Sequence, residues 1–410
     1  MTKLDQLIKD LCPNGVEYKT LGELGEFYGG LTGKTKEDFK DGNADFVTYK
    51  NIYSNPALSI DIEAKVKINA NEKQNTVQYG DVLFTGSSET PEECGMSSVL
   101  TIQTDKKLYL NSFCFGFRFK QLDLFNPDFC KHLFRSFSLR KQLQKTADGV
   151  TRFNVSKKKM AKVTIPVPPL VVQNEIVRIL DTFTELTAEL TAELTARKQQ
   201  YEYYRNSLLT FDDSVPMVKL KDICKKICSG GTPSTSNKAY YNGVIPWLRT
   251  QEVDWVDITD TEIKITEEAV KNSSAKWIKP NCVIVAMYGA TAGKVAINKI
   301  PLTTNQACCN LEIDENKALY RYVFHWLYKE YLSLKSLGQG SQSNINGNIV
   351  KNYLIPLPPL SEQEYIVKIL DRFDTLCSNI SQGLPAEIKA RQQQYEYYRN
   401  KLLTFEEVKA

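Results

Sequence analysis

A fifteen-residue phrase occurs twice in this chain of 410 residues and constrains its fold more than any other feature. The copies at residues 197–211 and 391–405 read RKQQYEYYRNSLLTF and RQQQYEYYRNKLLTF, and they differ at only two positions. A second pair of similar segments precedes them, with IPVPPLVVQNEIVRILDTF beginning at Ile165 and IPLPPLSEQEYIVKILDRF beginning at Ile355. Two copies with a period near 200 residues indicate duplicated domains rather than a solenoid.

The duplication extends into the blocks between these segments. Gly29-Gly30 aligns with Gly230-Gly231, and Val82-Leu83-Phe84 aligns with Val283-Ile284-Val285, both at an offset of 201 residues. Residues 47–52 and 248–253 align at the same offset, and residues 151–155 align with 341–345. The chain therefore alternates variable and repeated blocks. We place the boundaries at 1–155, 156–211, 212–345 and 346–410.

The repeated blocks are expected to be helical. Pro168-Pro169 and Pro358-Pro359 suit a helix entry, because the first turn of a helix needs no amide donors. Apolar residues then recur at steps of three or four, which is the spacing of one helix face: Ile176, Ile179, Phe183, Leu186, Leu190 and Leu194. Residues 171–211 contain no Gly or Pro, so one helix of about 40 residues is possible, about 60 Å long. A helix of that length should pair with the second copy.

The second copy is not identical in its middle. It contains Gly383-Leu384-Pro385, the residue types of a helix stop followed by a new start. We expect a break there and a shorter helix through RQQQYEYYRN. The first copy carries instead the repetition TELTAELTAELTA, which begins at Thr184.

The variable blocks differ in character from the repeated ones. Short β-rich runs such as VLF and CVIVAMY are separated by clusters of Gly, Asn, Ser and Thr. These blocks are predicted to be mixed α/β modules with long polar loops, where recognition residues usually lie.

Composition limits the function classes. The net charge is only +4, from 52 basic and 48 acidic residues, so a local basic face is possible but a strongly cationic chain is not. The first fifteen residues contain no apolar run typical of a signal peptide, and no window approaches eighteen apolar residues. The ten cysteines form no CxxC pair, and there are only two histidines, His132 and His325. We expect reduced, buried thiols in a cytoplasmic protein and no metal site.

Motifs that suggest catalysis are incomplete. GGLTGKT at residues 29–35 and GATAGKV at residues 289–295 are each one residue short of a phosphate-binding loop. Asn126-Pro127-Asp128-Phe129 has aspartate where an amino-methyltransferase loop needs a second proline, and no glycine-rich cofactor turn is found. With only two histidines, the chain has few residues suited to general acid–base catalysis. The sequence predicts a binding protein without catalytic residues.

The order of these blocks resembles the DNA-specificity subunit of type I restriction–modification enzymes, over essentially the whole chain. The resemblance rests on two variable modules, each followed by IPxPPLxxQ and a helix ending in QYEYYRNxLL, and on GGTPSTSNKAYYNGVIPWLRTQEV in the second half. The TAEL repetition resembles a subgroup in which its copy number sets the gap between half-sites. One departure is Val171-Val172-Gln173, where the family expects the acidic residue present in Ser361-Glu362-Gln363.

The resemblance implies a mixed α/β fold with pseudo-two-fold symmetry. Two globular target-recognition domains are held apart by an antiparallel coiled coil of two long conserved helices. It implies double-stranded DNA as ligand, with each domain reading half of a split, asymmetric target. The implied partners are two modification (methyltransferase) subunits and two motor–nuclease restriction subunits, and no membrane. S-adenosylmethionine, ATP and magnesium are then used by the partners, and this prokaryotic cytoplasmic chain binds no cofactor.

Base reading requires Arg, Lys, Asn, Gln, Ser or Thr on loops that reach the major groove. In the first module the candidates are Lys34, Thr35, Lys50, Asn51, Ser87, Ser88, Arg152 and Asn154. In the second module they are Thr232, Ser234, Arg249, Gln251, Tyr288, Gln342 and Asn344. Lys157-Lys158-Lys159 suits phosphates or solvent better than bases.

The tyrosines of the repeated phrase are candidates for docking. Tyr201 and Tyr204, like Tyr395 and Tyr398, have helical spacing and suit helix–helix or subunit packing better than base stacking. Identical copies are expected if two identical partners need equivalent surfaces.

Two other functions are compatible with the sequence. A self-sufficient methyltransferase or nuclease would act on DNA alone, and a coiled-coil adaptor would bind only protein. Activity of the purified chain and sequence-dependent DNA affinity discriminate between the three hypotheses.

Overall fold

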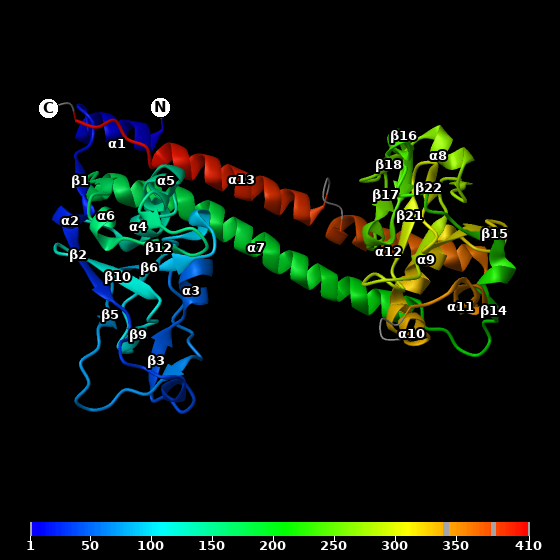
Figure 1. Cartoon of the computed structure of the whole chain (residues 1–410), viewed down its shortest axis with the longest axis horizontal. Helices are drawn as coiled ribbons and strands as arrows, with labels where there is room; N and C mark the ends of the chain where they lie inside the picture. The colour runs from blue at the N-terminus through cyan, green and yellow to red at the C-terminus, as the bar shows by residue number, and fades with distance from the viewer. Residues whose placement is uncertain (1, 339–343, 379–382, 409–410) are drawn as a thin grey trace. The chain divides into compact units, whose positions relative to one another are not determined.

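The computed structural model describes residues 2–338, 344–378 and 383–408, and the chain forms two compact units. Unit 1 comprises Met1–Glu189 and Ile388–Ala410, and unit 2 comprises Leu190–Glu387. Each unit therefore combines one variable block with parts of both repeated blocks. Figure 1 shows the strands and short helices of each unit beside the helices of the repeated blocks.

Unit 1 begins with helix α1 (Lys3–Leu11) and ends with α13 (Leu384–Leu402), of which the part from Ile388 belongs to it. Its other helical elements are α2 (Leu21–Leu24), η1 (Lys36–Phe39), α3 (Tyr49–Ser54), η2 (Pro91–Glu93), α4 (Pro127–Leu133), α5 (Phe137–Gln144), α6 (Lys157–Met160) and the first part of α7 (Leu170–Leu208). Its strands are β1 (Tyr18–Thr20), β2 (Gly25–Gly29), β3 (Ala44–Val47), β4 (Lys65–Val66), β5 (Thr76–Val77), β6 (Val82–Thr85), β7 (Ser87–Ser88), β8 (Ser97–Val99), β9 (Leu108–Leu110), β10 (Cys114–Phe119), β11 (Ala147–Asp148), β12 (Phe153–Val155) and β13 (Thr164–Pro166).

Unit 2 contains the rest of α7 and the helix α12 (Leu360–Ser378). Its other helical elements are η3 (Leu220–Ile223), η4 (Lys238–Tyr240), η5 (Thr250–Glu252), α8 (Glu267–Lys271), α9 (Tyr320–Lys329), α10 (Tyr331–Ser336) and α11 (Gly347–Asn352). Its strands are β14 (Met217–Lys219), β15 (Cys224–Ser229), β16 (Tyr241–Leu248), β17 (Asp257–Ile258), β18 (Lys264–Ile265), β19 (Trp277–Ile278), β20 (Val283–Ala286), β21 (Val295–Asn298), β22 (Leu302–Thr304), β23 (Cys308–Ile313) and β24 (Leu354–Pro356).

The two units share one sheet topology, and the mixed α/β fold is confirmed. The order β2-β10-β6-β8 in unit 1 corresponds to β15-β23-β20-β21-β17 in unit 2. The order β4-β3-β9-β5 corresponds to β18-β16-β22-β19, and in both sheets the central pair is parallel. The two-stranded sheet β1-β13 corresponds to β14-β24.

The strand registers agree with most of the offsets in the sequence. Phe84 faces Phe115 in unit 1, and Val285 faces Cys309 in unit 2, so residues 84 and 285 are equivalent at an offset of 201 and residues 115 and 309 at an offset of 194. The glycine pair has an offset of 200 residues instead of 201, because Gly29 faces Phe115 whereas Ser229 faces Cys309. Gly30 is therefore equivalent to Gly230. Both lie so close to backbone carbonyls of the neighbouring segment that a side chain would clash there.

The glutamine of each IPxPPLxxQ segment fixes a repeated block to its variable block. Gln173 is fully buried; its Oε1 accepts from the Asn126 amide at 2.8 Å, and its Nε2 donates to the carbonyls of Leu124 and Pro168. Gln363 makes the same contacts with Leu319, Lys317 and Pro358. Every polar atom of a buried amide is thus satisfied, which makes the motif a structural joint.

The N-terminal helix explains the departure from the family pattern at Val172. Val172 is fully buried in the same apolar core as Leu4 of α1, and Lys3 of α1 pairs with Glu175 at 2.9 Å. The equivalent Glu362 is exposed in unit 2. An apolar residue suits position 172 because α1 covers this face of the helix.

The repeated blocks are helical, with α7 extending over 39 residues. In the second copy α12 ends at Ser378 and α13 begins at Leu384, so a new helix starts beside Gly383 and Pro385, where the sequence predicted a break. The long helices α7 and α13 are in contact within unit 1, where Phe183 stacks on Tyr398. Figure 1 shows α13, in red, running beside the first part of α7 in the opposite direction. Among the described helices, none combines the length and the apolar character needed to cross a bilayer.

Candidate nucleic-acid interface

Five loops of unit 1 meet at one end of its sheets. The Gly30 amide donates to the Cys114 carbonyl, and the Gly86 amide donates to the Phe113 carbonyl at 2.8 Å. The Tyr49 hydroxyl donates to the Ser87 carbonyl at 2.9 Å, and Asn154 of β12 faces Ser87 of β7. The loops at residues 30–35, 48–51, 86–90, 111–113 and 151–154 are therefore joined by hydrogen bonds. This surface is called the unit 1 loop cluster below.

A depression of about 290 Å³ lies within the unit 1 loop cluster. Its lining includes Gly29, Gly30, Ser87, Phe113, Asn154 and Lys157. The glycines expose backbone there, and Asn154 and Lys157 are exposed side chains that can donate to phosphates or base edges. The depression can therefore take part of a polar, anionic ligand.

The structure separates the unit 1 candidates into free and engaged side chains. Thr35, Lys50, Arg152 and Asn154 are exposed. Lys34 is almost fully buried, with its Nζ 2.6 Å from Glu72. Asn51 uses its amide on Ser59 and Asn55, while Ser87 and Ser88 are buried and bond Arg152 and Glu93 respectively. Lys50 and Asn154 have no such contact among the described residues, whereas the Thr35 hydroxyl donates to Asp38 at 2.9 Å and Arg152 donates to the Ser87 hydroxyl at 3.1 Å.

Phe113 was not among the sequence candidates. Its ring is 59% exposed at the tip of the β9–β10 loop, and the Arg152 guanidinium lies 5.5 Å from the ring centroid. An exposed Phe held beside an Arg in a polar depression suits contact with a base face or a thymine methyl. The aligned segments offered no signal for it, because the equivalent residue in unit 2 is Ala307.

Unit 2 brings together the equivalent segments that the structure describes, at residues 230–236, 249–252, 287–292, 305–307 and 344–345, which are called the unit 2 loop cluster. The Met287 amide donates to the Ala307 carbonyl at 2.8 Å, and the Ile345 amide donates to the Met287 carbonyl at 2.9 Å. Thr291 donates its hydroxyl to the Thr250 carbonyl at 2.8 Å. The same backbone frame thus carries unequal side chains, since Lys50 is replaced by Gln251 and Ser87 by Tyr288.

The unit 2 candidates also differ in their exposure and in their internal contacts. Thr232, Ser234, Gln251 and Tyr288 are exposed, and Asn344 accepts from the Gly289 amide at 3.2 Å. Arg249 is largely buried, and its guanidinium lies 2.5 Å from Glu262 and 3.9 Å from Glu252. Gln342 lies outside the described residues. The DNA-binding roles of both sets remain predictions.

The incomplete motifs have structural roles. GATAGKV forms the connection between β20 and β21, where a phosphate-binding loop would lead into a helix, and Gly289 and Gly293 have φ of 81° and 87°. Asn126 caps α4 by accepting from the Asp128 amide at 2.8 Å, with Pro127 in the first turn. These segments are accounted for as a hairpin and a helix cap.

The tyrosines of the repeated phrase also separate by exposure. Tyr201 is 4% exposed and Tyr395 is half-buried, and both pack into the cores of their own units. Tyr204 and Tyr398 are 39% and 38% exposed. Tyr203 and Tyr397, which the sequence did not single out, are 69% and 61% exposed. The docking role of this phrase stays a prediction, now with more exposed members.

Two equivalent α/β domains, each with a polar loop cluster and each joined to duplicated helices, define a two-module recognition protein. Residues 13–197 and 213–390 match the type I restriction modification DNA specificity domain. The chain therefore belongs to this family of type I restriction–modification DNA specificity proteins.

Two similar relatives are named as type I specificity subunits. The chain is 40% identical over 263 residues to the specificity subunit of type I restriction enzyme EcoR124I/EcoR124II from Escherichia coli, over 61% of this chain and 65% of that subunit. It is 34% identical over 276 residues to a putative type I specificity subunit of Haemophilus influenzae, S.HindORF215P, over 63% of this chain and 68% of that one. The chain thus spans about two thirds of these relatives, and slightly less of the first.

Solved structures share the fold. The S subunit of the type I system from M. genitalium aligns with a TM-score of 0.57 and 13% identity, over 95% of this chain and 96% of that one. A chain solved in a study of complex assembly and conformational transition of the type I R-M system aligns with a TM-score of 0.63 and 19% identity, over 95% and 98%.

Proposed function

We propose that this chain reads a bipartite, asymmetric DNA target and directs adenine methylation and restriction by partner subunits. The observation that carries the proposal is the pair of equivalent loop clusters, which have the same backbone frame and different exposed side chains. Two loop clusters with the same backbone and different exposed side chains suit two half-sites of different sequence. The first recognition domain is assigned to residues 1–155 and the second to residues 212–345, with the repeated blocks at 156–211 and 346–410.

The exposed candidates are assigned to the bases and the lysine run to phosphates. Arg152 and Asn154 in unit 1, with Gln251 in unit 2, have the fork-shaped or amide groups that make bidentate base contacts. Lys157 borders the unit 1 depression and suits a phosphate beside the bases read there. Lys34 and Arg249 are assigned to holding their loops in place, because their charges are already paired with Glu72 and Glu262.

The partners are assigned by membership of the family. Two modification subunits, which use S-adenosylmethionine, and two motor–nuclease subunits, which use ATP and magnesium, complete the complex. The relative named for EcoR124I/EcoR124II is the specificity subunit of a restriction enzyme, which supports such an assembly. The ten free cysteines suit the reducing cytoplasm of a prokaryote.

The modification subunits are assigned to the exposed face of the repeated phrase. Tyr203 and Tyr397 are equivalent residues on α7 and α13, and Tyr204 and Tyr398 lie beside them. Exposed tyrosines are frequent anchors of interfaces. Because the phrase is duplicated, it offers the same anchor twice, as two identical partners require.

The TAEL repetition is assigned to setting the spacer between half-sites. It lies inside α7, so another TAEL unit would add four residues, about 6 Å, to a helix. This corresponds to one or two base pairs of DNA, at about 3.4 Å for each. Inserting TAEL after Leu194 should lengthen the unread spacer and leave both half-sites unchanged. An unchanged spacer in methylation maps of the variant would contradict this role.

The proposal is tested by long-read methylation mapping of a methylation-deficient host that expresses the chain with its modification subunits. We expect one split motif with methylated adenine on each strand. A host without the chain, but with the modification subunits, serves as the control and should show no such motif. A continuous motif, or methylation independent of the chain, would overturn the proposal.

A further inference from the structure

The two histidines occupy equivalent positions at the joints between variable and repeated blocks. His132 lies in α4 and His325 in α9, which are the first helices after β10 and β23, the last strands of the two main sheets along the chain. Both are buried, with 1% and 0% exposure. They are 193 residues apart, within the range of offsets of the duplication. A buried histidine needs partners for both ring nitrogens.

Each histidine joins the two copies of the repeated block. His132 has its Nε2 2.7 Å from Asp181 of α7 and its Nδ1 2.8 Å from the Tyr395 hydroxyl of α13. His325 has its Nε2 2.7 Å from Asp371 of α12 and its Nδ1 3.2 Å from the Tyr201 hydroxyl of α7. The aspartate comes from one copy and the tyrosine from the other, in both units. We call each His–Asp–Tyr set a socket.

The partners define the protonation state of the socket. A carboxylate only accepts, so Nε2 carries the proton and donates to Asp; the bare Nδ1 then accepts from the Tyr hydroxyl. Burial lowers the pKa of both histidines and raises the pKa of Tyr201 and of Tyr395, so the rings stay neutral and the hydroxyls stay protonated. Every polar atom of the socket is then correctly paired.

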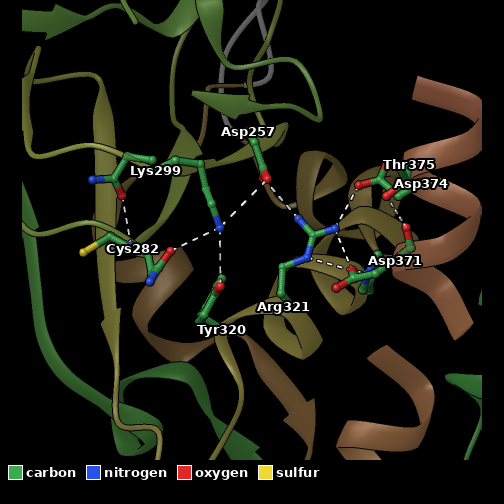
Figure 2. A network of polar contacts seen from close by, with 11 residues as sticks. Asp257, Cys282, Lys299, Tyr320, Arg321, Asp371, Asp374 and Thr375 are labelled. Atoms are coloured by element: carbon green, nitrogen blue, oxygen red, sulfur yellow. Dashed lines mark hydrogen bonds and ion pairs between the residues drawn. The ribbon is translucent and has the colours of Figure 1, made fainter. Parts of the chain in front are cut away.

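A cationic residue of the variable block pairs with the aspartate of each socket, and this residue differs between the two units. In unit 1, Lys131 of α4 lies 2.9 Å from Asp181. In unit 2, Arg321 of α9 lies 2.6 Å from Asp371, and Figure 2 shows it between that carboxylate, Asp374 and Asp257 of β17. Unequal residues thus produce the same charged contact, which ties the variable block to the helices in both units.

We propose that His132 and His325 are positioning residues, which fix the orientation of each recognition domain on both copies of the repeated block. The inference rests on the proposed function, because orientation matters only if the loop clusters read DNA. A recognition domain that can tilt on its helices presents the same side chains at the wrong depth or angle, so discrimination between bases falls before the fold is lost.

The test uses the full chain in complex with its modification subunits. Tyr395→Phe and Tyr201→Phe each remove one hydroxyl and keep the ring. Methylation rates are measured on duplexes with single-base changes in either half-site. We expect Tyr395→Phe to reduce discrimination about threefold to tenfold in the half-site read by unit 1 only, and Tyr201→Phe to do so in the other. Tyr79→Phe and Tyr365→Phe, at exposed tyrosines outside the sockets, are the controls.

A second pair of variants separates positioning from packing. His132→Gln keeps an amide that can donate to Asp181, and His132→Leu does not, so the Gln variant should retain more discrimination than the Leu variant. Equal losses at both half-sites, or a change in unfolding midpoint without any change in discrimination, would overturn the positioning role. A wild-type complex that does not discriminate between sequences would instead refute the proposed function.

Discussion

The ring of Phe183 stacks on the ring of Tyr398 in unit 1, with centroids 5.3 Å apart and planes 18° apart. Phe373 and Tyr204 repeat this pair in unit 2, at 5.3 Å and 25°. Each pair joins the end of one ILDxF segment to the YEYY phrase of the other copy. The repeated segments are therefore partners of each other, in addition to any surface that they offer to other subunits.

Removing one of these rings should destabilise its own unit. Phe183→Ala is expected to lower the free energy of unfolding by about 2 kcal/mol, through lost apolar burial and lost ring stacking. Denaturant unfolding followed by fluorescence and circular dichroism measures it. Tyr203→Ala, at a ring that is 69% exposed, should change stability by less than about 0.5 kcal/mol. Similar effects of the two variants would contradict the packing described.

Stability should fall at low pH, because His132 and His325 become protonated in the unfolded chain while they stay neutral in the fold. The pKa of His132 and of His325 is lowered in the fold by burial, so their contribution is complete above the unfolded value of about 6.5 and is lost as pH falls below it. The charged groups around them are Asp181, Lys131, Asp128 and Arg399 in unit 1, and Asp371, Asp374, Arg321 and Arg205 in unit 2. Unfolding midpoints measured between pH 5 and 8 should decrease towards pH 5.

The matched variants locate that dependence in the histidines. His132→Gln combined with His325→Gln removes both titrating rings, so the slope between pH 6.5 and 5 should become shallower than in the wild type. An unchanged slope would show that other groups, and not the two histidines, cause the pH dependence.

Arg152 should discriminate bases in the half-site read by unit 1. Its exposed guanidinium is steadied by Phe113 and by the Ser87 hydroxyl, at 3.1 Å. Arg152→Ala should cost about 1–3 kcal/mol of discrimination at one base pair. Arg152→Lys, which keeps the charge and loses the fork, should lose nearly as much. If both variants preserve discrimination and only the salt dependence of binding changes, Arg152 contacts phosphate instead.

Tyr203 and Tyr397 should hold one modification subunit each. Either substitution to Ala is expected to weaken one of two binding steps by about 2 kcal/mol or more, since exposed tyrosines are typical interface anchors. Native mass spectrometry at limiting concentration should then show complexes with one modification subunit. Tyr365→Ala, at another exposed helix tyrosine, should retain two. Full occupancy in the Tyr203→Ala, Tyr397→Ala double variant would exclude this face.

The duplication made most of the fold accessible from sequence. Its offsets placed the equivalent strands, because Val82-Leu83-Phe84 and Val283-Ile284-Val285 are short apolar runs at the same place in each sheet. The absence of Gly and Pro across residues 171–211 indicated the length of α7. Both are local signals, of the kind that periodicity and propensity record.

The state of individual site residues depended on partners distant in sequence. Lys34 is paired with Glu72, and Arg249 with Glu262, and neither contact follows from a local pattern. Likewise, helical spacing grouped Tyr201 with Tyr204, but only the position of His325 shows that the first faces inward. The sockets did leave one signal, since the chain has two histidines and their separation matches the duplication.

Exchange of a module shows whether each recognition domain reads one half of a split target. Residues 1–155 are replaced by the corresponding block of another family member that retains His at position 132, and the methylated motif is mapped by long-read sequencing. One half-site should change while the other half-site and the spacer length are preserved. A motif that changes in both halves, or in neither, would contradict this expectation.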